Sequence, residues 1–278
     1  MAVTAVGYVH GYSGSEAVRL GDQADTLAEL LHTGTGYPAG SRVLEVGCGV
    51  GAQTVHLAGA SPGAHIVAFD ISSQSLAQAR ARMAGVTAPP GGPRLAWCRA
   101  DLHGLPFADG AFDHMFVCFV LEHLPDPQQA LARFRRVLRP GGTITVVEGD
   151  HGSAFYHPNS AYARAVIDCQ VRLQSAAGGN ALIGRQLHPL LVGAGYTDVV
   201  VRPRVVYADQ SRPGLVDGFT RRTFNAMVKA VRDDALAAGL INRSDWARGV
   251  ADLDRTAEDG GTFSYTFFRA VAVSDRRS

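Results

Sequence analysis

The sequence predicts an α/β fold built on a doubly wound, mostly parallel sheet. From Arg42 onward, short apolar runs rich in β-branched residues alternate with segments of helical pattern, which is typical of parallel strands covered by helices on both faces. The chain has 278 residues, of which 46% are hydrophobic and 18% charged. This length and balance suffice for one substantial core, so we expect a single domain over 1–278.

Each strand is expected where an apolar run meets a turn or a polar residue. The second strand closes on Asp70, the third is followed by Asp101, and the fifth follows the turn Pro140-Gly141-Gly142. The seven expected strands are 42–46, 65–69, 94–99, 114–119, 143–148, 199–207 and 262–273. The expected helices are 15–31, 52–60, one capped by Ser72-Ser73, 159–175, 186–192, 215–238 and 244–258.

The last expected strand differs from the others. It follows helical residues and alternates aromatic with small polar side chains, a pattern that favours a half-exposed antiparallel strand at the edge of the sheet. Helical patterns also interrupt the regular alternation at 151–183 and 208–260. We therefore divide the domain into an N-terminal segment, 1–36, a core, 37–150, and these two helical insertions.

Charge and composition argue against several classes of function. The formal net charge is +1 and the arginines are dispersed, whereas a nucleic-acid-binding protein needs a concentrated basic face. No apolar run approaches the ~20 residues of a membrane span, and the first ten residues do not resemble a signal peptide. We expect a cytoplasmic protein that binds neither nucleic acid nor membrane, and Cys48, Cys98, Cys118 and Cys169 form no C-x-x-C pair that would indicate zinc or a disulfide framework.

A glycine loop follows the first expected strand. Gly47, Gly49 and Ala52 fit the G-x-G-x-x-G/A pattern, in which a tight turn brings backbone N–H groups against a nucleotide. The same spacing serves nicotinamide dinucleotides, so the loop alone leaves an oxidoreductase open. Glu45 favours a different ligand, because a carboxylate buried in an apolar strand needs a compensating partner such as an ammonium group.

Two further acids follow the second and third expected strands. Asp70 can accept both hydroxyls of a ribose, which supports nucleoside binding without identifying the nucleoside. Asp101 can accept the exocyclic amine of adenine, while Ile71 and Leu102 lie on either side of the ring. The three acids together therefore predict a site for an adenosine that carries an amino-acid part.

These motifs resemble the class I methyltransferases, specifically the type that methylates ubiquinone and menaquinone. The segments that carry the resemblance span about residues 40–150 and are 43–51 (VLEVGCGVG), 70–72 (DIS), 100–102 (ADL), 105–107 (LPF), 112–113 (FD), 121–124 (LEHL) and 139–142 (RPGG). The resemblance implies a Rossmann-like seven-stranded sheet with an antiparallel last strand. It also implies S-adenosylmethionine as the methyl donor, with S-adenosylhomocysteine as the product.

The donor contacts expected from this resemblance lie at the carboxyl ends of the first four strands, with Gln53 and Phe119 added by their positions. They are Glu45, Gly47, Cys48, Gly49, Gln53, Asp70, Ile71, Ala100, Asp101, Leu102 and Phe119. Methyl transfer is an in-line displacement at a carbon already activated by sulfonium, so the protein mainly aligns the nucleophile and the donor. No metal is expected, and His151 and His157 with Asp150 match no strong zinc pattern.

A base helps when the acceptor must lose a proton. The candidates lie just after strands four and five, where ligands bind in open α/β sheets. They are Glu122, His123, Glu148, Asp150 and His151. His123 belongs to a loop that the resembled family carries for many acceptors, so His151 is the preferred base, and a reaction without any base stays open.

The segments outside the minimal fold are expected to form the acceptor side. Tyr8 and Tyr12 lie in a glycine-hinged N-terminal stretch that we expect to close over the donor as a lid. The aromatic residues expected to line the acceptor pocket are Phe155, Tyr156, Tyr162, Phe219, Phe224 and Tyr265. For each of these residues, plain packing in the core is the alternative.

We therefore expect methylation of a small aromatic or heteroaromatic metabolite at oxygen, nitrogen or carbon, with an indole ring carbon as a narrower hypothesis. Lys229 is the only lysine among many arginines, alanines and glycines, which is typical of GC-rich genomes and favours a tailoring enzyme of specialised metabolism. The alternatives are a donor-binding regulator or scaffold without turnover, and a protein or tRNA methyltransferase. The sequence leaves open whether the chain forms a homo-oligomer.

Overall fold

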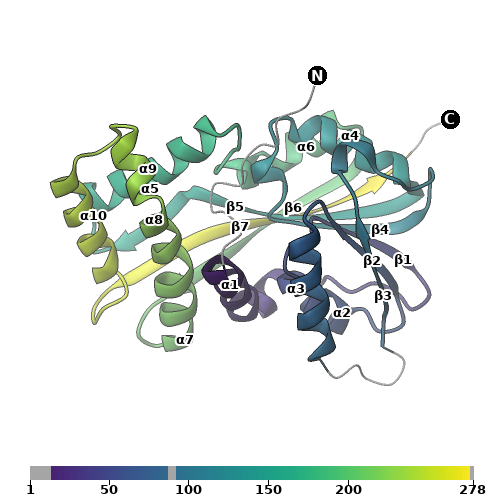
Figure 1. Ribbon diagram of the computed structural model, residues 1–278, viewed down its shortest axis with the longest axis horizontal. Coiled ribbons are helices and arrows are strands. Elements are labelled where there is room, and N and C mark those ends of the chain that lie inside the picture. Colours follow the sequence, from purple (N-terminus) through teal and green to yellow (C-terminus); the bar gives the residue numbers. More distant parts are fainter. Residues whose placement is uncertain (1–13, 87–91, 276–278) are drawn as a thin grey trace.

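One seven-stranded sheet runs through the protein, with helices on both of its faces (Figure 1). The computed structural model describes residues 14–86 and 92–275. The strands are β1 (Arg42–Val46), β2 (His65–Asp70), β3 (Arg94–Arg99), β4 (Phe112–Cys118), β5 (Leu138–His157), β6 (Thr197–Ala208) and β7 (Thr262–Ser274). Their order in the sheet is β3-β2-β1-β4-β5-β7-β6, and β7 is antiparallel to both of its neighbours. The predicted seven strands and the antiparallel last strand are confirmed.

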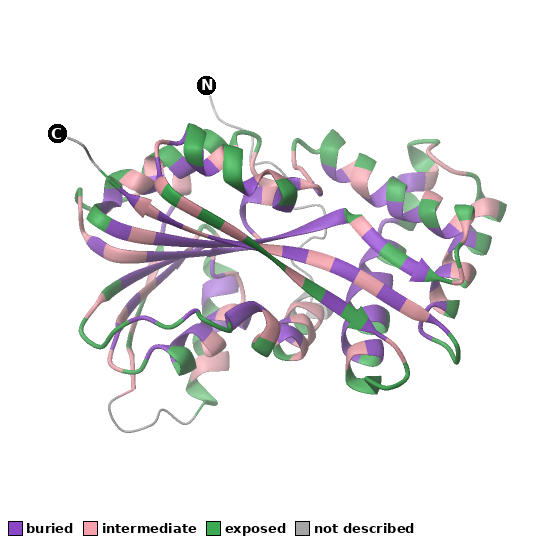
Figure 2. Cartoon of the chain, turned by 180° about the vertical axis from the view of Figure 1, so that it is seen from behind, coloured by how far each residue is buried: buried purple, intermediate pink, exposed green. Residues whose placement is uncertain are grey.

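Alternation along β1 explains the two hydrophobic cores. Val43 shares one core cluster with Leu57 of α2 (Ala52–Ala60), and Leu44 shares the other with Phe134 of α4 (Pro127–Val137). All four side chains are buried, as a parallel strand covered on both faces requires. Figure 2 shows the same arrangement, with buried strands inside and exposed helix faces outside.

The helices come close to their expected positions. They are α1 (Gly14–His32), α2 (Ala52–Ala60), α3 (Ser73–Ala84), α4 (Pro127–Val137), α5 (Ala161–Ala176), α6 (Leu187–Gly193), α7 (Pro213–Leu215), the π-helix η4 (Val216–Asn225), α8 (Ala226–Ala230), α9 (Arg232–Ala237) and α10 (Arg243–Arg255). Short 3₁₀ turns are η1 (Leu102–Gly104), η2 (Leu121–His123) and η3 (Ile183–Gln186). The expected cap at Ser72 is present, because its hydroxyl accepts from Ser75 N at 3.1 Å. The single helix expected over 215–238 is instead divided among α7, η4, α8 and α9.

Strand β5 is much longer than expected. The prediction ended it at Glu148, but it continues to His157 because the extended β7 supplies backbone partners as far as Thr262. Residues 151–157 of the expected helical insertion are therefore strand, and α5, α8, α9 and α10 gather along this extension (Figure 1). Gly149 and Gly152, which look like a loop in the sequence, lie inside the strand.

The expectation that the last strand forms the edge of the sheet is wrong. Strand β7 lies between β5 and β6, and β6 forms the edge. The alternating sequence pattern of β7 does not reflect an exposed face. Its side chains alternate between buried and partly buried positions under helices. The exposed side chains of Val205 and Tyr207 belong to β6.

Gly51 closes the loop after β1 in a conformation and a space that only glycine fits. Its φ is 75°, and a Cβ there would lie 2.9 Å from Ala79 Cβ of α3. We predict that Gly51→Ala lowers the unfolding free energy by more than about 2 kcal/mol, from backbone strain plus overlap. Gly40 is the matched control, since its φ is 81° and nothing lies within 4 Å of a Cβ, so Gly40→Ala should cost about 1 kcal/mol. Equal losses in urea denaturation would contradict the role of the Ala79 contact.

Candidate active site

The loop after β1 is shaped by glycines and held by its neighbour β2. Gly47, Gly49 and Gly51 have φ of 62°, 52° and 75°, all in the left-handed region that favours glycine. Cys48 N donates to Phe69 O at 3.0 Å, and Gly51 N donates to Cys48 O at 2.9 Å. The loop therefore turns tightly at the carboxyl end of β1, with open space around the Cβ position of Gly49.

Asp70 joins this loop to the end of β2. Its Oδ2 accepts from Gly49 N at 2.9 Å, and its Oδ1 accepts from Ser72 N at 2.8 Å. Each carboxylate oxygen has a second lone pair, so two ribose hydroxyls can still donate to the same group. The structure thus places the predicted ribose-binding acid directly against the glycine loop.

The residues expected around adenine follow β2 and β3. Asp101 is exposed, and its Oδ1 accepts from His103 N at 2.8 Å to begin η1. Ile71 is 51% exposed although it is a large apolar side chain. Ala100 N donates to Asp70 O at 3.1 Å, which holds the ends of the two strands side by side. An exposed apolar side chain that directly follows Asp70, with Asp101 after the neighbouring strand, fits a flat ring with a polar edge.

Glu45 lies beneath the loop, and the described part of the chain places no counter-charge beside it. Its side chain is buried, and its Oε2 has no hydrogen-bond partner among the described residues. Burial, opposed by a hydrogen bond with Thr54 and helped by the nearby Asp70, raises the pKa of Glu45 to about 7. A buried oxygen that lacks a donor fits the ammonium group of S-adenosylmethionine, reached directly or through an intervening water or loop amide.

Gln53 and Phe119 border the loop in different ways. Gln53 Oε1 lies 2.7 Å from His32 Nε2, so the side chain connects α2 to α1. Phe119 has a φ of 57°, which is rare outside glycine, and its N donates to Val147 O at 3.0 Å. This turn sends the chain from β4 into η2 beside the loop.

Glu148 on β5 shapes the segment that follows β4. Its Oε1 accepts from Val120 N at 3.0 Å and from Leu121 N at 2.7 Å, while its buried Oε2 has no partner among the described residues. Burial, and then the nearby Glu122, raise the pKa of Glu148 well above its usual range. Glu148 therefore positions η2 rather than serving as a free base.

The two predicted acid–base residues of η2 pair with each other. Glu122 Oε1 lies 3.5 Å from His123 Nε2, and Glu122 Oε2 accepts from Gln174 Nε2 at 3.1 Å. Asn180 N donates to Glu122 O at 2.7 Å. Helix α5 thus contacts this turn and covers it on the acceptor side.

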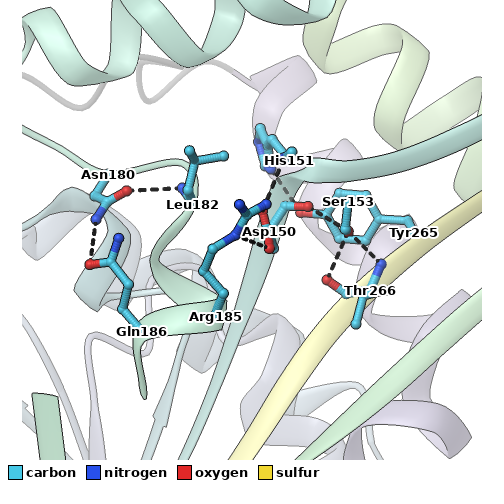
Figure 3. A network of polar contacts seen from close by, with 10 residues as sticks. Asp150, His151, Ser153, Asn180, Leu182, Arg185, Gln186, Tyr265 and Thr266 are labelled. Atoms are coloured by element: carbon cyan, nitrogen blue, oxygen red, sulfur yellow. Dashed lines mark hydrogen bonds and ion pairs between the residues drawn. The ribbon is translucent and has the colours of Figure 1, made fainter. Parts of the chain in front are cut away.

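Asp150 and His151 lie next to each other on β5 but have different partners (Figure 3). Asp150 is buried and accepts two hydrogen bonds from Arg185, at 2.6 and 2.7 Å. His151 is also buried, and its Nδ1 lies 2.7 Å from Tyr265 Oη. Burial lowers the pKa of His151, so its imidazole is neutral near pH 7. His151 is therefore better suited than Asp150 to accept a proton.

The expected aromatic pocket residues divide between two faces. Phe155 pairs with Ser264 and is 75% exposed, so it lies on the opposite face of the strand from Tyr156. Tyr156 stacks on Phe263 with ring centroids 6.2 Å apart. Phe219, Phe224 and Tyr265 are buried in the same aromatic cluster, whereas Tyr8 and Tyr12 lie outside the described residues.

Sequence reasoning missed three features of the site. Arg185 had no role, although it is the ion-pair partner of Asp150. Gly149 and Gly152 also had no assigned role, although a Cβ at Gly149 would overlap Tyr265 Oη and a Cβ at Gly152 would lie 2.6 Å from Arg185 Nη2. The spacing Gly-Asp-His-Gly was the available signal, because glycines on both sides of buried polar residues indicate close packing.

The strand order, the glycine loop and the acids after the first three strands define a Rossmann-like methyltransferase fold. Residues 44–146 match the family model described as Methyltransferase domain. This part of the chain is therefore a class I methyltransferase domain dependent on S-adenosylmethionine, as its motifs predicted, and the nicotinamide alternative is not supported.

The comparisons with individual proteins agree with this assignment. The chain is 37% identical over 110 residues to a demethylmenaquinone methyltransferase of Clavibacter sepedonicus, which covers 40% of this chain and 42% of that protein. It is 36% identical over 195 residues to a 37.1 kDa protein in transposon Tn4556 of Streptomyces fradiae. This match covers 68% of this chain and 53% of that protein. The structure of the [4+2]-cyclase SpnF has a TM-score of 0.54 at 22% identity, covering 90% of this chain and 81% of that one, and shows the shared fold alone.

The chain spans about half the length of the curated relatives it matches. Over the ranges 14–86 and 92–275, no helix combines the length and apolar character that crossing a membrane would need.

The raised pKa of Glu45 gives a pH-dependent stability. Its folded-state value of about 7 exceeds the ordinary 4.5, so its contribution to stability is full below pH 4.5 and is lost as the pH rises through 7. Glu45→Gln removes this loss. In the absence of donor and above pH 7, we predict that the unfolding free energy of the variant exceeds that of wild type by about 2 to 3 kcal/mol. Urea denaturation at pH 5 and pH 8 measures the difference, with the exposed Glu29→Gln as control. A difference independent of pH would contradict the burial of a titrating Glu45.

Proposed function

We propose that the protein transfers the methyl group of S-adenosylmethionine to a small aromatic or heteroaromatic metabolite. The observation that carries the proposal is the buried Oε2 of Glu45 beneath the glycine loop, which has no hydrogen-bond partner among residues 14–86 and 92–275. A nicotinamide dinucleotide has no ammonium group to offer that carboxylate, whereas the methionine part of the donor does. When bound, the donor supplies a sulfonium-activated methyl carbon.

The residues of this chain then have three tasks. The loop amides and Asp70 hold the nucleoside, and Asp101 with Ile71 receives the adenine. Glu45 and the ends of β1 and β4 orient the amino-acid part. Because displacement at carbon needs an in-line approach, this fixed orientation supplies most of the rate enhancement expected of the protein.

His151 is the proposed base for acceptors that lose a proton. Tyr265 Oη engages Nδ1 at 2.7 Å, which leaves Nε2 as the nitrogen that accepts the proton. Nδ1 must then carry hydrogen and donate to Tyr265 Oη. Asp150 is paired with Arg185, and Glu122 contacts His123 and Gln174. Both acids are therefore proposed to orient and balance the site rather than to accept the proton.

The acceptor class rests on the surroundings of His151. The imidazole lies among aromatic rings, with Phe224 and Tyr265 at centroid distances of 6.0 and 5.8 Å. An apolar aromatic environment with a few polar groups suits a flat organic molecule. The formal net charge is +1 and the arginines are dispersed along the sequence, which argues against a basic face for tRNA. An indole ring carbon and a role in specialised metabolism stay part of the proposal, as does assembly into homo-oligomers.

Incubation of the pure protein with methyl-labelled donor, with and without a bacterial metabolite extract, tests the function. Label should move into an extractable small molecule only when the extract is present. Donor binding without acceptor-dependent transfer across a broad panel would favour a regulator or scaffold. Label in protein or in added tRNA would favour a macromolecular acceptor.

Asp70→Ala should weaken binding of S-adenosylhomocysteine by about 100-fold. The substitution removes two hydrogen bonds to the loop backbone and the charged acceptor for the ribose. Isothermal titration calorimetry measures the dissociation constant, with Asp109→Ala, an exposed carboxylate after β3, as the control. Unchanged affinity in Asp70→Ala would exclude the ribose assignment.

His151→Asn should lower turnover about 100-fold with less than a threefold change in donor affinity, because a base acts on the acceptor. Burial lowers the pKa of His151 below 6.5. Wild-type turnover of the acceptor found in the labelling screen should therefore fall only as the pH drops below 6.5, where the imidazole becomes charged. Full turnover by His151→Asn would exclude His151 as the base. The same fall in turnover below pH 6.5 in the variant as in wild type would also exclude it.

A further inference from the structure

Strand β5 contains a wide bulge next to the proposed base. Asp150 pairs with Thr266 and Phe155 pairs with Ser264, so five steps along β5 face two steps along β7. His151, Gly152, Ser153 and Ala154 occupy the bulge. Bulges next to active sites redirect side chains that a regular strand would place elsewhere.

A set of polar contacts holds the bulge in one shape (Figure 3). Ser153 Oγ donates to Asp150 O at 2.6 Å and accepts from Thr266 N at 2.9 Å. Asp150 Oδ1 also accepts from Gly152 N at 3.0 Å. His151 N donates to Ala181 O at 2.9 Å. The carbonyl of Asp150 and the N–H groups of His151 and Gly152 are therefore each held by a different partner.

Arg185 of η3 brings a charged side chain against this bulge, as Figure 3 shows. Its Nε lies 2.6 Å from Asp150 Oδ2 and its Nη2 lies 2.7 Å from Asp150 Oδ1, a bidentate geometry that fixes the carboxylate plane. The Asp150 side chain is 3% exposed and that of Arg185 is 48% exposed. The pair thus extends from the buried bulge to the surface.

Glycines on both sides of Asp150 and His151 make room for this arrangement. A Cβ at Gly152 would lie 2.6 Å from Arg185 Nη2, and a Cβ at Gly149 would overlap Tyr265 Oη. Neither contact tolerates a side chain without displacing the Arg185 or the Tyr265 group. The two glycines in the sequence and the side chains that pack against them therefore both favour the observed conformation of the bulge.

We propose that Arg185 is a positioning residue, which by clamping Asp150 fixes the β5 bulge and so directs the His151 ring toward the acceptor. This inference rests on the proposed function, because it assigns a partner to the proposed base. The other titratable or charged groups that face His151 are Glu122 and His123 of η2, Asp150 of β5, Arg19 of α1 and Tyr265 of β7. Arg185 balances Asp150, the group closest to His151 in the chain.

Nuclear magnetic resonance of protein labelled at histidine tests the inference without any acceptor. His151→Asn identifies the His151 signals. In wild type, the ¹⁵N shifts should report one tautomer, with hydrogen on Nδ1. In Arg185→Gln they should move toward a mixture, and the titration midpoint of His151 should rise by about one pH unit, since Asp150 is no longer balanced. Arg185→Lys should keep the midpoint but not the single tautomer, because it retains charge without the bidentate geometry.

Gly152→Ala gives an independent arm, since it displaces Arg185 Nη2 without removing the charge. It should also produce a tautomer mixture. Arg139→Gln is the matched control, because Arg139 Nε lies 2.6 Å from Asp113 Oδ1 with a 55% exposed side chain near the opposite end of β5. It should leave the His151 signals unchanged.

Unchanged tautomer and midpoint in Arg185→Gln would overturn the inference, as would an equal change in Arg139→Gln. If Arg185→Gln does not fold, Arg185→Lys and Gly152→Ala decide the question, and wild-type signals in both would overturn it. The outcome is separate from the proposed function. Full turnover by His151→Asn would disprove the base while leaving the resonance result intact, and failure of the resonance result would leave the base intact.

Discussion

The antiparallel pairing of β5 with β7 is the constraint on which the rest of the structure depends. It extends the sheet beyond the parallel core, from Gly142 opposite Ser274 to His157 opposite Thr262. The parallel half carries the donor loop at its carboxyl edge, and the extension carries His151 and the aromatic cluster. This pair of strands, interrupted by the bulge between Asp150 and Phe155, therefore sets the distance and direction between the glycine loop and the proposed acceptor side, which an in-line transfer requires.

Buried carboxylates give this site its electrostatic character. Glu45 and Glu148 each have one oxygen without a partner in the described part of the chain, and burial raises the pKa of both. Such groups cost stability when ionised. Glu148 offsets part of that cost by accepting two backbone hydrogen bonds that shape η2. Glu45 accepts no such backbone hydrogen bonds in the described part of the chain, so a cationic ligand would offset the cost of ionising it and would couple stability to ligand affinity.

The donor side could be predicted because it follows local rules. A strand that ends in glycines must turn, and an acid at the end of a parallel strand must face the carboxyl edge of the sheet. The positions of Asp70, Asp101 and Gly51 therefore follow from their places in the chain. The acceptor side could not be predicted in the same way, because Gly149 and Gly152 look like a loop until a long partner strand is present. Phe155 and Tyr156 are neighbours in sequence, yet the alternation of that strand sends them to opposite faces.

The sequence by itself determined the class of fold, the methyl donor and the residues nearest the glycine loop, since hydrophobic periodicity and short motifs act over a few residues. The tertiary structure decided how far β5 runs, where β7 lies in the sheet, and which partner each buried polar group has. These depend on pairing between segments more than 100 residues apart, such as His151 with Tyr265 and Arg269 with Thr35. No local pattern specifies such a partner, because a buried charge or hydroxyl can be satisfied by any donor or acceptor that the fold brings within reach.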